Sequence, residues 1–488
     1  MHRLSTHKNK IFSVFFMLGI LFCFLFSSCK KDRINTSDAV AFSTDTLTFD
    51  TLFTTLGSTT KFFTIRNTHK ESIVISSIAL AGGNNSPYRI NVNGDAGTTF
   101  HDIQIPAKDS IYVFVEVTID PNVANLPFIV EDSIQFTTNG NVQQVQLNAY
   151  GQNAHFFNAD SLETNTVWND DLPYVILNYL QIKPGVSLTI NAGCNVYFGG
   201  GAAMIVEGNL NVEGTDTSNM VTFRGVRLDK DVADRPYDDF PGQYAGLFFL
   251  RGSTGNLKFL EMRNSLYGIN VGNIKSTDDA AQNLTLLQNM NLGNAPIVTI
   301  QNSKIYNHAF YGLFGFYGRI YATNTLVYDC GKNVVGLYCG GDYEFLNCTF
   351  SSHGSAYISH AKDPVFYVNN FFDAVEPAIL ADTTRAVFQN CILYGTLENE
   401  VVAQGATNNP HLPFVYLTNS VVKTNEPSSP IFNACNFTDP QFKDIFKSDY
   451  HLKTTSPAGN LGIAPYPSID IDGFVRNNPP DAGAYEIQ

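Results

Sequence analysis

Three residues that can bind transition metals recur at one position of a sequence repeat. His308, Cys330 and His353 each stand six residues after an asparagine, and Asp329 lies beside the cysteine. Imidazole nitrogens and thiolates are common protein ligands of zinc and related metals. If the repeats stack as coils about 4.8 Å apart, the two histidines lie about 9.6 Å apart at the backbone. The pattern therefore indicates either a metal site in which both rings lean inward or turn residues around a buried cysteine.

His360, Lys362 and Asp363 form a second cluster, with residue types suited to acid–base chemistry. Strand alternation would place His360 and Lys362 on one face. A polysaccharide lyase needs a base beside the sugar ring and a cation, commonly Ca²⁺, Arg or Lys, that neutralises the uronate. The three residues are therefore candidate catalytic groups. A glycoside hydrolase needs two carboxylates about 5–10 Å apart, and we find no column of acidic residues at equal repeat positions.

An acidic segment interrupts the repeat. It contains Asp229-Lys230-Asp231-Val232-Ala233-Asp234 and, further on, Asp238-Asp239. Carboxylates are the ligands that Ca²⁺ prefers, but the regular ligand spacing and the glycine of an EF-hand loop are missing. The segment fits either a Ca²⁺ site or a solvated loop, and we expect no other cofactor.

Several aromatic residues cluster around a second strand of the repeat. They are Phe314, Phe316, Tyr338 and Tyr357. Because side chains alternate along a strand, some of these rings must face outward. Rows of exposed rings on a flat parallel sheet suit stacking against sugars. The four residues are therefore candidate ligand-binding residues, and the hydrophobic core is the alternative location for them.

An asparagine followed by a small residue and apolar residues recurs along the second half of the chain. Successive asparagines are 38, 22, 23, 22, 21 and 29 residues apart. A coil of this size cannot bury its apolar face alone, whereas stacked coils share one core; a β-propeller would need about 40 residues per blade. Asparagine tolerates the left-handed conformation of a sharp corner. The repeat predicts a right-handed parallel β-helix with an asparagine ladder of Asn264, Asn302, Asn324, Asn347, Asn369, Asn390 and Asn419.

The ladder also bears on two cysteines. Cys348 and Cys391 each follow a ladder asparagine and so occupy the same repeat position. Counting Asn369 as a coil of its own places them two coils apart, beyond the about 7 Å that a disulfide spans between Cα atoms. We therefore expect both to be small residues of the ladder.

The first coils resemble pectate-lyase-like right-handed β-helix proteins. The matching segments are residues 182–190, Gly193, residues 204–208, Gly214-Thr215 and residues 221–223. The resemblance implies that residues 160–488 form a β-helix domain, and that polysaccharide lyases and hydrolases are among its relatives.

The tail of the chain resembles the bacterial choice-of-anchor Q group. The matching segments are Asp439-Pro440-Gln441-Phe442, Asp449-Tyr450-His451-Leu452, Ser456-Pro457-Ala458, Asp470-Ile471-Asp472-Gly473 with Arg476, and Asp481-Ala482-Gly483-Ala484-Tyr485-Glu486. A solenoid end exposes strand edges, and charged turn residues suit the covering of such edges. We therefore expect the tail to be a C-terminal cap, with a functional site as the alternative.

The first residues follow the plan of an export signal. A basic start precedes an apolar run from Ile11 to Phe26 that is short for a bilayer span. The run ends in Phe26-Ser27-Ser28-Cys29, which resembles the lipobox of bacterial lipoproteins. The resemblance implies that residues 1–28 are a signal peptide, that Cys29 is lipidated and that residues 29–39 are a linker. We expect an outer-membrane lipoprotein of the cell envelope, on either leaflet; the alternative is an uncleaved anchor followed by a free cysteine.

Residues 40–152 alternate between short apolar strands and turns. Six or seven such runs in about 110 residues predict a β-sandwich. The region resembles the Ig-like domains of the abnormal-spindle and hydin family in Arg66-Asn67, in Ile103-Gln104-Ile105 running into Pro106, and in a last strand that reaches Tyr150-Gly151. The resemblance implies a spacer or docking module without catalysis. The expected fold is all-β: an Ig-like β-sandwich followed by a right-handed parallel β-helix solenoid.

Composition and charge limit the possible functions. The 488 residues carry a formal net charge of −14. Nucleic-acid surfaces need basic patches that neutralise phosphates, so nucleic acid is excluded as a partner. The leading hypothesis is an envelope-anchored lipoprotein, held on the membrane by its lipid, whose β-helix binds extracellular glycan or a surface partner without catalysis. The alternative is a polysaccharide lyase or glycoside hydrolase acting on an acidic polysaccharide.

Overall fold

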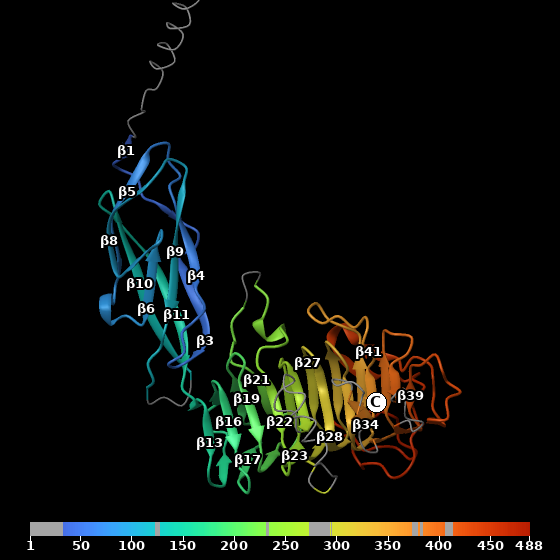
Figure 1. The fold of residues 1–488 in the computed structure, drawn as a ribbon. Coiled ribbons are helices and arrows are strands. Elements are labelled where there is room, and N and C mark those ends of the chain that lie inside the picture. The colour runs from blue at the N-terminus through green and yellow to red at the C-terminus, as the bar shows by residue number, and fades with distance from the viewer. Residues whose placement is uncertain are drawn as a thin grey trace, which may run out of the picture. The chain divides into compact units, whose positions relative to one another are not determined.

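The computed structural model describes residues 33–122, 127–230, 234–272, 293, 295–372, 379–380, 384–405 and 413–488. These residues form strands, turns and three single-turn 3-10 helices (Figure 1). They divide into two compact units, one from the described residues of 1–49, 55–120 and 129–150 and one from those of 50–54, 121–128 and 151–488. The predicted signal peptide (1–28) and Cys29 lie outside the described residues. Within the described ranges no helix is long and apolar enough to cross a bilayer.

The N-terminal unit contains two sheets. One has the strand order β1-β5-β10-β11-β3 with β8 beside β5, and the other has the order β2-β4-β9-β6-β7. Rings from the two sheets meet: the Phe136 ring of β10 lies 4.7 Å from the Phe42 ring of β2. The strands are β1 (Ile34–Asn35), β2 (Ala41–Phe42), β3 (Thr46–Phe53), β4 (Lys61–Arg66), β5 (Ser72–Leu80), β6 (Tyr88–Val92), β7 (Asp95–Gly97), β8 (Thr99–Ile105), β9 (Ser110–Val117), β10 (Phe128–Thr138) and β11 (Asn141–Gln152).

The C-terminal unit is a parallel β-helix, so the predicted all-β class and the solenoid are confirmed (Figure 1). Each coil except the last contributes a strand to each of three rows, and the last contributes to rows A and C. Row A is a sheet of its own: β12 (His155–Phe157), β15 (Tyr174–Ile176), β18 (Asn195–Phe198), β21 (Val221–Gly225), β24 (Leu260–Arg263), β27 (Lys304–His308), β29 (Leu326–Cys330), β31 (Thr349–Ser352), β36 (Ile392–Gly395) and β39 (Val421–Val422).

Rows B and C share a second sheet. Row B consists of β13 (Asp160–Leu162), β16 (Tyr179–Ile182), β19 (Ala203–Val206), β22 (Gly246–Phe249), β25 (Tyr267–Gly272), the first halves of β28 (Tyr311–Thr323) and β30 (Val335–Leu346), β32 (Phe366–Asn369) and β37 (Val401–Gln404). Row C consists of β14 (Thr166–Trp168), β17 (Ser187–Asn191), β20 (Asn209–Glu213), β23 (Thr254–Lys258), β26 (Ile297–Gln301), the second halves of β28 and β30, β35 (Thr384–Gln389), β38 (Phe414–Thr418) and β40 (Phe432–Asn433).

Stacking in register builds the core from columns of apolar side chains. In row C, for example, Ile300 pairs with Ala322, Ala322 with Phe345, and Phe345 with Phe388. These four residues are at most 2% exposed, and one connected cluster of buried side chains extends from Trp168 to Val422. Since burial of a large apolar side chain contributes about 1.5–3 kcal/mol, the columns are the main source of the solenoid's stability.

The predicted asparagine ladder lies at the corner between rows C and A. Each corner residue has a φ between 47° and 54°, and in all but Ala434 the backbone N–H donates to a row C carbonyl of the next coil at 3.0–3.1 Å. Asparagine adopts this left-handed conformation at low cost, which explains its recurrence. The corner residues are Phe259, Asn302, Asn324, Asn347, Asn390, Asn419 and Ala434.

Two asparagines were assigned to this ladder wrongly. Asn264 follows a row A strand and lies at the corner towards row B, where its Oδ1 accepts a hydrogen bond from Asn307 Nδ2 at 2.9 Å. Asn369 ends β32 in row B, and its Oδ1 accepts from the Cys339 N–H at 3.2 Å. The coil that contains β31, β32 and β35 is longer than its neighbours, and Asn369 happens to fall near its middle.

This correction changes the placement of two cysteines. Thr349 and Ile392 are paired in neighbouring row A strands, so Cys348 and Cys391, one residue earlier, lie on adjacent coils about 4.8 Å apart. The expectation that they stand two coils apart was wrong. Both are buried free thiols in the structure.

The tail packs along the outer face of row A in the β-helix, and its predicted role as a C-terminal cap stays a prediction. It contains β41 (Phe442–Asp444), the 3-10 helix η3 (Ile445–Lys447) and β42 (Asp449–Leu452). All five residues of β29 are buried, because one face points into the core and the other is covered by the tail. The shared apolar cluster includes Leu326, Tyr328, Ile392 and Val421 of row A and Phe442, Tyr450, Leu452, Ala458, Ile471, Ala482, Ala484 and Tyr485 of the tail.

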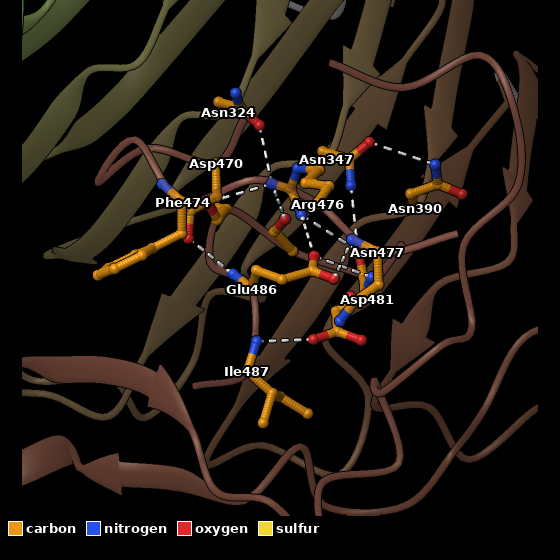
Figure 2. Close-up of polar contacts among 12 residues, drawn as sticks. Asn324, Asn347, Asn390, Asp470, Phe474, Arg476, Asn477, Asp481, Glu486 and Ile487 are labelled. Atoms are coloured by element: carbon orange, nitrogen blue, oxygen red, sulfur yellow. Dashed lines mark hydrogen bonds and ion pairs between the residues drawn. The ribbon is translucent and has the colours of Figure 1, made fainter. Parts of the chain in front are cut away.

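Arg476 joins the tail to the asparagine ladder (Figure 2). Its Nη2 donates to Asn324 Oδ1 at 2.8 Å and to the Gly483 carbonyl at 3.0 Å. Its Nη1 lies 3.1 Å from Glu486 Oε2, and both side chains are 0% exposed. Asn347 Nδ2 donates to the Asp481 carbonyl at 3.1 Å. Tail residues therefore form hydrogen bonds with one another and with the ladder amides inside the protein.

Replacing Arg476 with methionine should lower the free energy of unfolding by about 3–5 kcal/mol, because the Glu486 carboxylate stays buried without its partner. Denaturant unfolding followed by fluorescence measures the loss. Arg385→Met is the matched control, since Arg385 pairs with Asp342 at 40% side-chain exposure; it should cost at most about 1 kcal/mol. Equal effects of the two substitutions would contradict the assignment.

Candidate functional site

Two adjoining cavities of about 730 and 290 Å³ open at the corner between rows A and B. We call them together the corner groove. They share Asp329, Ser355, Tyr357 and Ser448 in their walls. The groove is enclosed by three segments that lie far apart in the sequence: the 3-10 helix η2 (Tyr237–Asp239), the loop 353–360 and the tail beside η3.

The floor of the groove continues a second column of left-handed corner residues. Asn264, Asn307 and Asp329 occupy equal positions on successive coils, because Arg263 pairs with Tyr306 and Tyr306 with Tyr328. Their φ values are 71°, 57° and 46°. Asn and Asp are the side chains that best tolerate this conformation. Asp329 therefore occupies the corner position that Asn264 and Asn307 occupy on the two preceding coils.

Asp329 is a buried acid. It is only 6% exposed, and its Oδ1 accepts a hydrogen bond from the His353 N–H at 3.1 Å. Burial raises the pKa of Asp329 to about 6, although hydrogen bonds from the His353 and Gly354 backbone oppose the shift. The group can therefore exchange a proton near neutral pH.

The opposite wall carries two further carboxylates with different roles. Asp238 accepts ion pairs from Arg224 and Arg263 at 3.0 Å each, so its charge is compensated. Asp239 is exposed, and its backbone carbonyl accepts a hydrogen bond from Asn307 Nδ2 at 2.9 Å. Asn307 stands one coil from Asp329, and both Asp239 and Asp329 line the smaller cavity.

His353 and His360 both line the larger cavity, but their side chains have different neighbours. Burial lowers the pKa of His353 to about 4, so its ring is neutral at pH 7, with Nδ1 3.3 Å from Ser351 Oγ. His360 Nε2 lies 3.0 Å from both carboxylate oxygens of Glu400. The side chains of that pair are 1% and 0% exposed, so it supports the groove from below.

The predicted grouping of His360, Lys362 and Asp363 is wrong in its geometry. The segment is a loop and not a strand, so alternation does not apply. His360 points inward to Glu400, Lys362 is exposed and Asp363 is half-buried.

The three residues of the predicted metal column do not face one common site. His308 pairs in register with Cys330, and both are fully buried. His308 Nδ1 lies 2.7 Å from Ser265 Oγ, and burial lowers the pKa of His308 to about 3. His353 leaves the stack and lines the groove. In the described ranges no group of three or more His, Cys, Asp or Glu residues is arranged to hold a metal ion.

Part of the acidic segment considered for Ca²⁺, residues 231–233, lies outside the described residues. Asp229 Oδ2 lies 2.7 Å from Arg227 Nη2, and Asp234 Oδ1 lies 3.1 Å from Lys230 Nζ. The carboxylates at its two ends are thus engaged by cations of the chain. A Ca²⁺ site there stays a prediction.

The four predicted ligand-binding aromatics fall into separate places. Phe314 and Tyr338 pack together on the outer face of row B, with ring centroids 5.4 Å apart. Phe316 is buried, with 5% exposure. Tyr357 lies in the corner groove, 4.3 Å from the Phe240 ring, with the Arg235 guanidinium 5.5 Å from its own ring centroid.

Sequence reasoning placed Asp329 and His353 in one candidate cluster but assigned Tyr357 to a separate aromatic set. It also noted Asp238 and Asp239 only as a possible cation loop, and it missed Ser448 of the tail. One signal was available: Asn307 and Asp329 are 22 residues apart, which is the spacing of the ladder itself.

A comparison with protein-family models supports the β-helix fold. Residues 288–442 match the family described as "Right handed beta helix region". A family 123 glycoside hydrolase from Clostridium perfringens aligns with a TM-score of 0.17 and 12% identity over 23% of this chain and 25% of its own; the match thus spans about a quarter of that enzyme. A human CEP192 ASH/PapD-like domain aligns with a TM-score of 0.16 and 11% identity over 25% of this chain and 91% of its own. No curated protein matches the sequence.

Asp329 should make stability depend on pH. Because its pKa is raised from 3.8 to about 6 on folding, the folded state binds the proton more tightly, and stability falls as the pH rises from 4 to 6. Asp329→Asn should remove up to about 3 kcal/mol of this dependence. Urea unfolding of both proteins at pH 4–7 measures it, and parallel curves would contradict the shift.

The control for this experiment is Asp216→Asn. Hydrogen bonds from Ser218, followed by those from Asn219, hold the pKa of Asp216 below its usual range. Its stabilising effect is therefore lost only as the pH falls below 4, with the opposite sign. That substitution should leave the pH 4–6 interval unchanged.

Proposed function

We propose that this protein is an envelope-anchored lipoprotein whose β-helix binds extracellular glycan in the corner groove. The observation that carries the proposal is the combination of aromatic and polar walls in one open cavity. Tyr357, whose ring packs against that of Phe240, supplies aromatic surface, while Asp239, Asn307 and Asp329 supply hydrogen-bonding groups. Sugars present both kinds of surface, since their C–H faces stack on rings and their hydroxyls need directed partners.

The anchor is proposed on the sequence. Cys29 ends a segment that resembles a lipobox, and several acyl chains hold a protein on a membrane where a single chain is marginal. The two sheets of the N-terminal unit are compatible with the proposed Ig-like spacer, which would separate the β-helix from the bilayer. The leaflet that carries the anchor, and the surface partner that the protein meets, depend on where the glycan lies.

A second candidate function is glycoside hydrolysis in the same groove. Asp329, with its raised pKa, has the property of a general acid, and the exposed Asp239 has that of a base or nucleophile. Arg224 and Arg263 are both paired with Asp238. The groove therefore suits a neutral sugar better than the acidic polysaccharide that the sequence suggested. It also suits hydrolysis better than the reaction of a uronate lyase.

Tyr357→Ala should weaken glycan binding at least tenfold, because it removes one stacking face of the groove. A glycan array identifies the ligand, and calorimetry on the full chain in detergent measures the affinity. Tyr179→Ala is the matched control, since Tyr179 is 40% exposed on row B of an early coil; it should bind as the wild type does. Binding to no glycan would refute the proposal.

Asp329→Asn separates binding from catalysis. If the groove hydrolyses glycan, the substitution should lower the release of new reducing ends at least 100-fold and leave the affinity within about threefold, because the amide cannot donate the proton. If the wild type binds a glycan and releases no new ends from it, the second candidate is eliminated and the first stands.

A further inference from the structure

Three aromatic side chains stand exposed side by side on the N-terminal unit. Phe62 of β4 and Tyr112 and Phe114 of β9 are 50%, 48% and 38% exposed. Their ring centroids are 5.6, 6.0 and 5.9 Å apart, and the Tyr112 and Phe114 rings are within 18° of parallel. We call these residues the aromatic platform.

The rings of the aromatic platform lie on the opposite face of the sheet from the hydrophobic core. On β9, Val113 and Val115 point inward and are 0% exposed, whereas Tyr112 and Phe114 point outward in strict alternation. Phe62 is paired with Phe114 across the strands, which brings the rings together on the outer face. Large apolar side chains gathered on an exposed face mark binding surfaces.

Polar side chains border the rings. Thr64 is paired with Tyr112 on one side, and Asn91 of β6 is paired with Phe114 on the other. Both are partly exposed, and each carries groups that can donate and accept hydrogen bonds. The platform is therefore flat and aromatic with a hydrogen-bonding border.

The exposed area identifies the class of ligand. At the exposed fractions above, three aromatic residues present roughly 300 Å², whereas a stable protein dimer needs about 800 Å² from each partner. An area of this size matches a few sugar rings. Aromatic rings favour the C–H faces of pyranoses, and the neutral side chains of Thr64 and Asn91 beside them can form hydrogen bonds with sugar hydroxyls.

We propose that the aromatic platform is a second glycan-binding site, which takes an uncharged polysaccharide chain by stacking its sugar rings. The site lies on the N-terminal unit and goes beyond glycan binding in the corner groove. It gives the unit a binding role in addition to the proposed one of spacer.

The test is co-sedimentation of the full chain in detergent with three insoluble uncharged polysaccharides: microcrystalline cellulose, insoluble β-1,3-glucan and starch granules. The wild type should be retained by at least one of them. The triple variant Phe62→Thr, Tyr112→Thr, Phe114→Thr should lose at least tenfold in retention, since threonine keeps the strands but offers no ring. The control Ile129→Thr, Val142→Thr replaces two exposed apolar residues of the same unit, 60% and 73% exposed, and should be retained as the wild type is.

The platform and the groove are distinguished by their variants. Tyr357→Ala should still sediment with the insoluble polysaccharide, and the triple variant should still bind the soluble ligand of the groove. Failure of groove binding thus leaves the platform proposal standing, and the reverse also holds.

Three outcomes would overturn the platform proposal. They are no retention of the wild type by any of the three polysaccharides, full retention of the triple variant, or a wild-type dimer in analytical ultracentrifugation that the triple variant abolishes. If the triple variant does not fold, which circular dichroism shows, the single Tyr112→Thr variant decides by the same criterion with an expected loss of at least threefold.

Discussion

Hydrogen bonding between neighbouring coils fixes their separation at about 4.8 Å, and the rest of the β-helix follows from that spacing. Every residue must lie above its equivalent, so a side chain that suits one coil has to suit the next. The apolar columns of row C obey this rule, and so do the two corner columns, where the backbone must take a left-handed conformation. Asp329 belongs to such a column. The position of an acid at the groove is thus a by-product of the geometry that turns the chain.

The two corners meet their polar requirements differently. At the corner between rows C and A, the ladder amides Asn324, Asn347 and Asn390 find partners in the tail, which brings Arg476 and Glu486 into the interior with it. At the corner between rows A and B, the tail reaches only as far as Ser448, and a cavity remains. The corner groove therefore lies where the tail no longer covers the β-helix.

The spacing of the asparagines was sufficient to predict the stacked fold, because a regular repeat leaves few other ways to bury its apolar positions. It was insufficient for the register. Asn264 and Asn369 have the right neighbours in sequence, but one belongs to another corner and the other to a long coil. The groove was harder still to predict: Asp239 and Ser448 approach Asp329 from about 90 and 120 residues away, and such contacts depend on how loops pack, which no local pattern encodes.

Solenoids without lateral contacts can fray from an end, since each coil touches only its neighbours. Here the tail is attached to four corner residues, because Asn324, Asn347, Asn390 and Asn419 all donate to carbonyls between Leu461 and Asp481. If the last coil unfolds, the tail therefore stays bound to earlier coils. If the tail detaches, several coils lose hydrogen bonds at once. The final coils therefore open as one cooperative block, so proteases cannot digest this end of the β-helix one coil at a time.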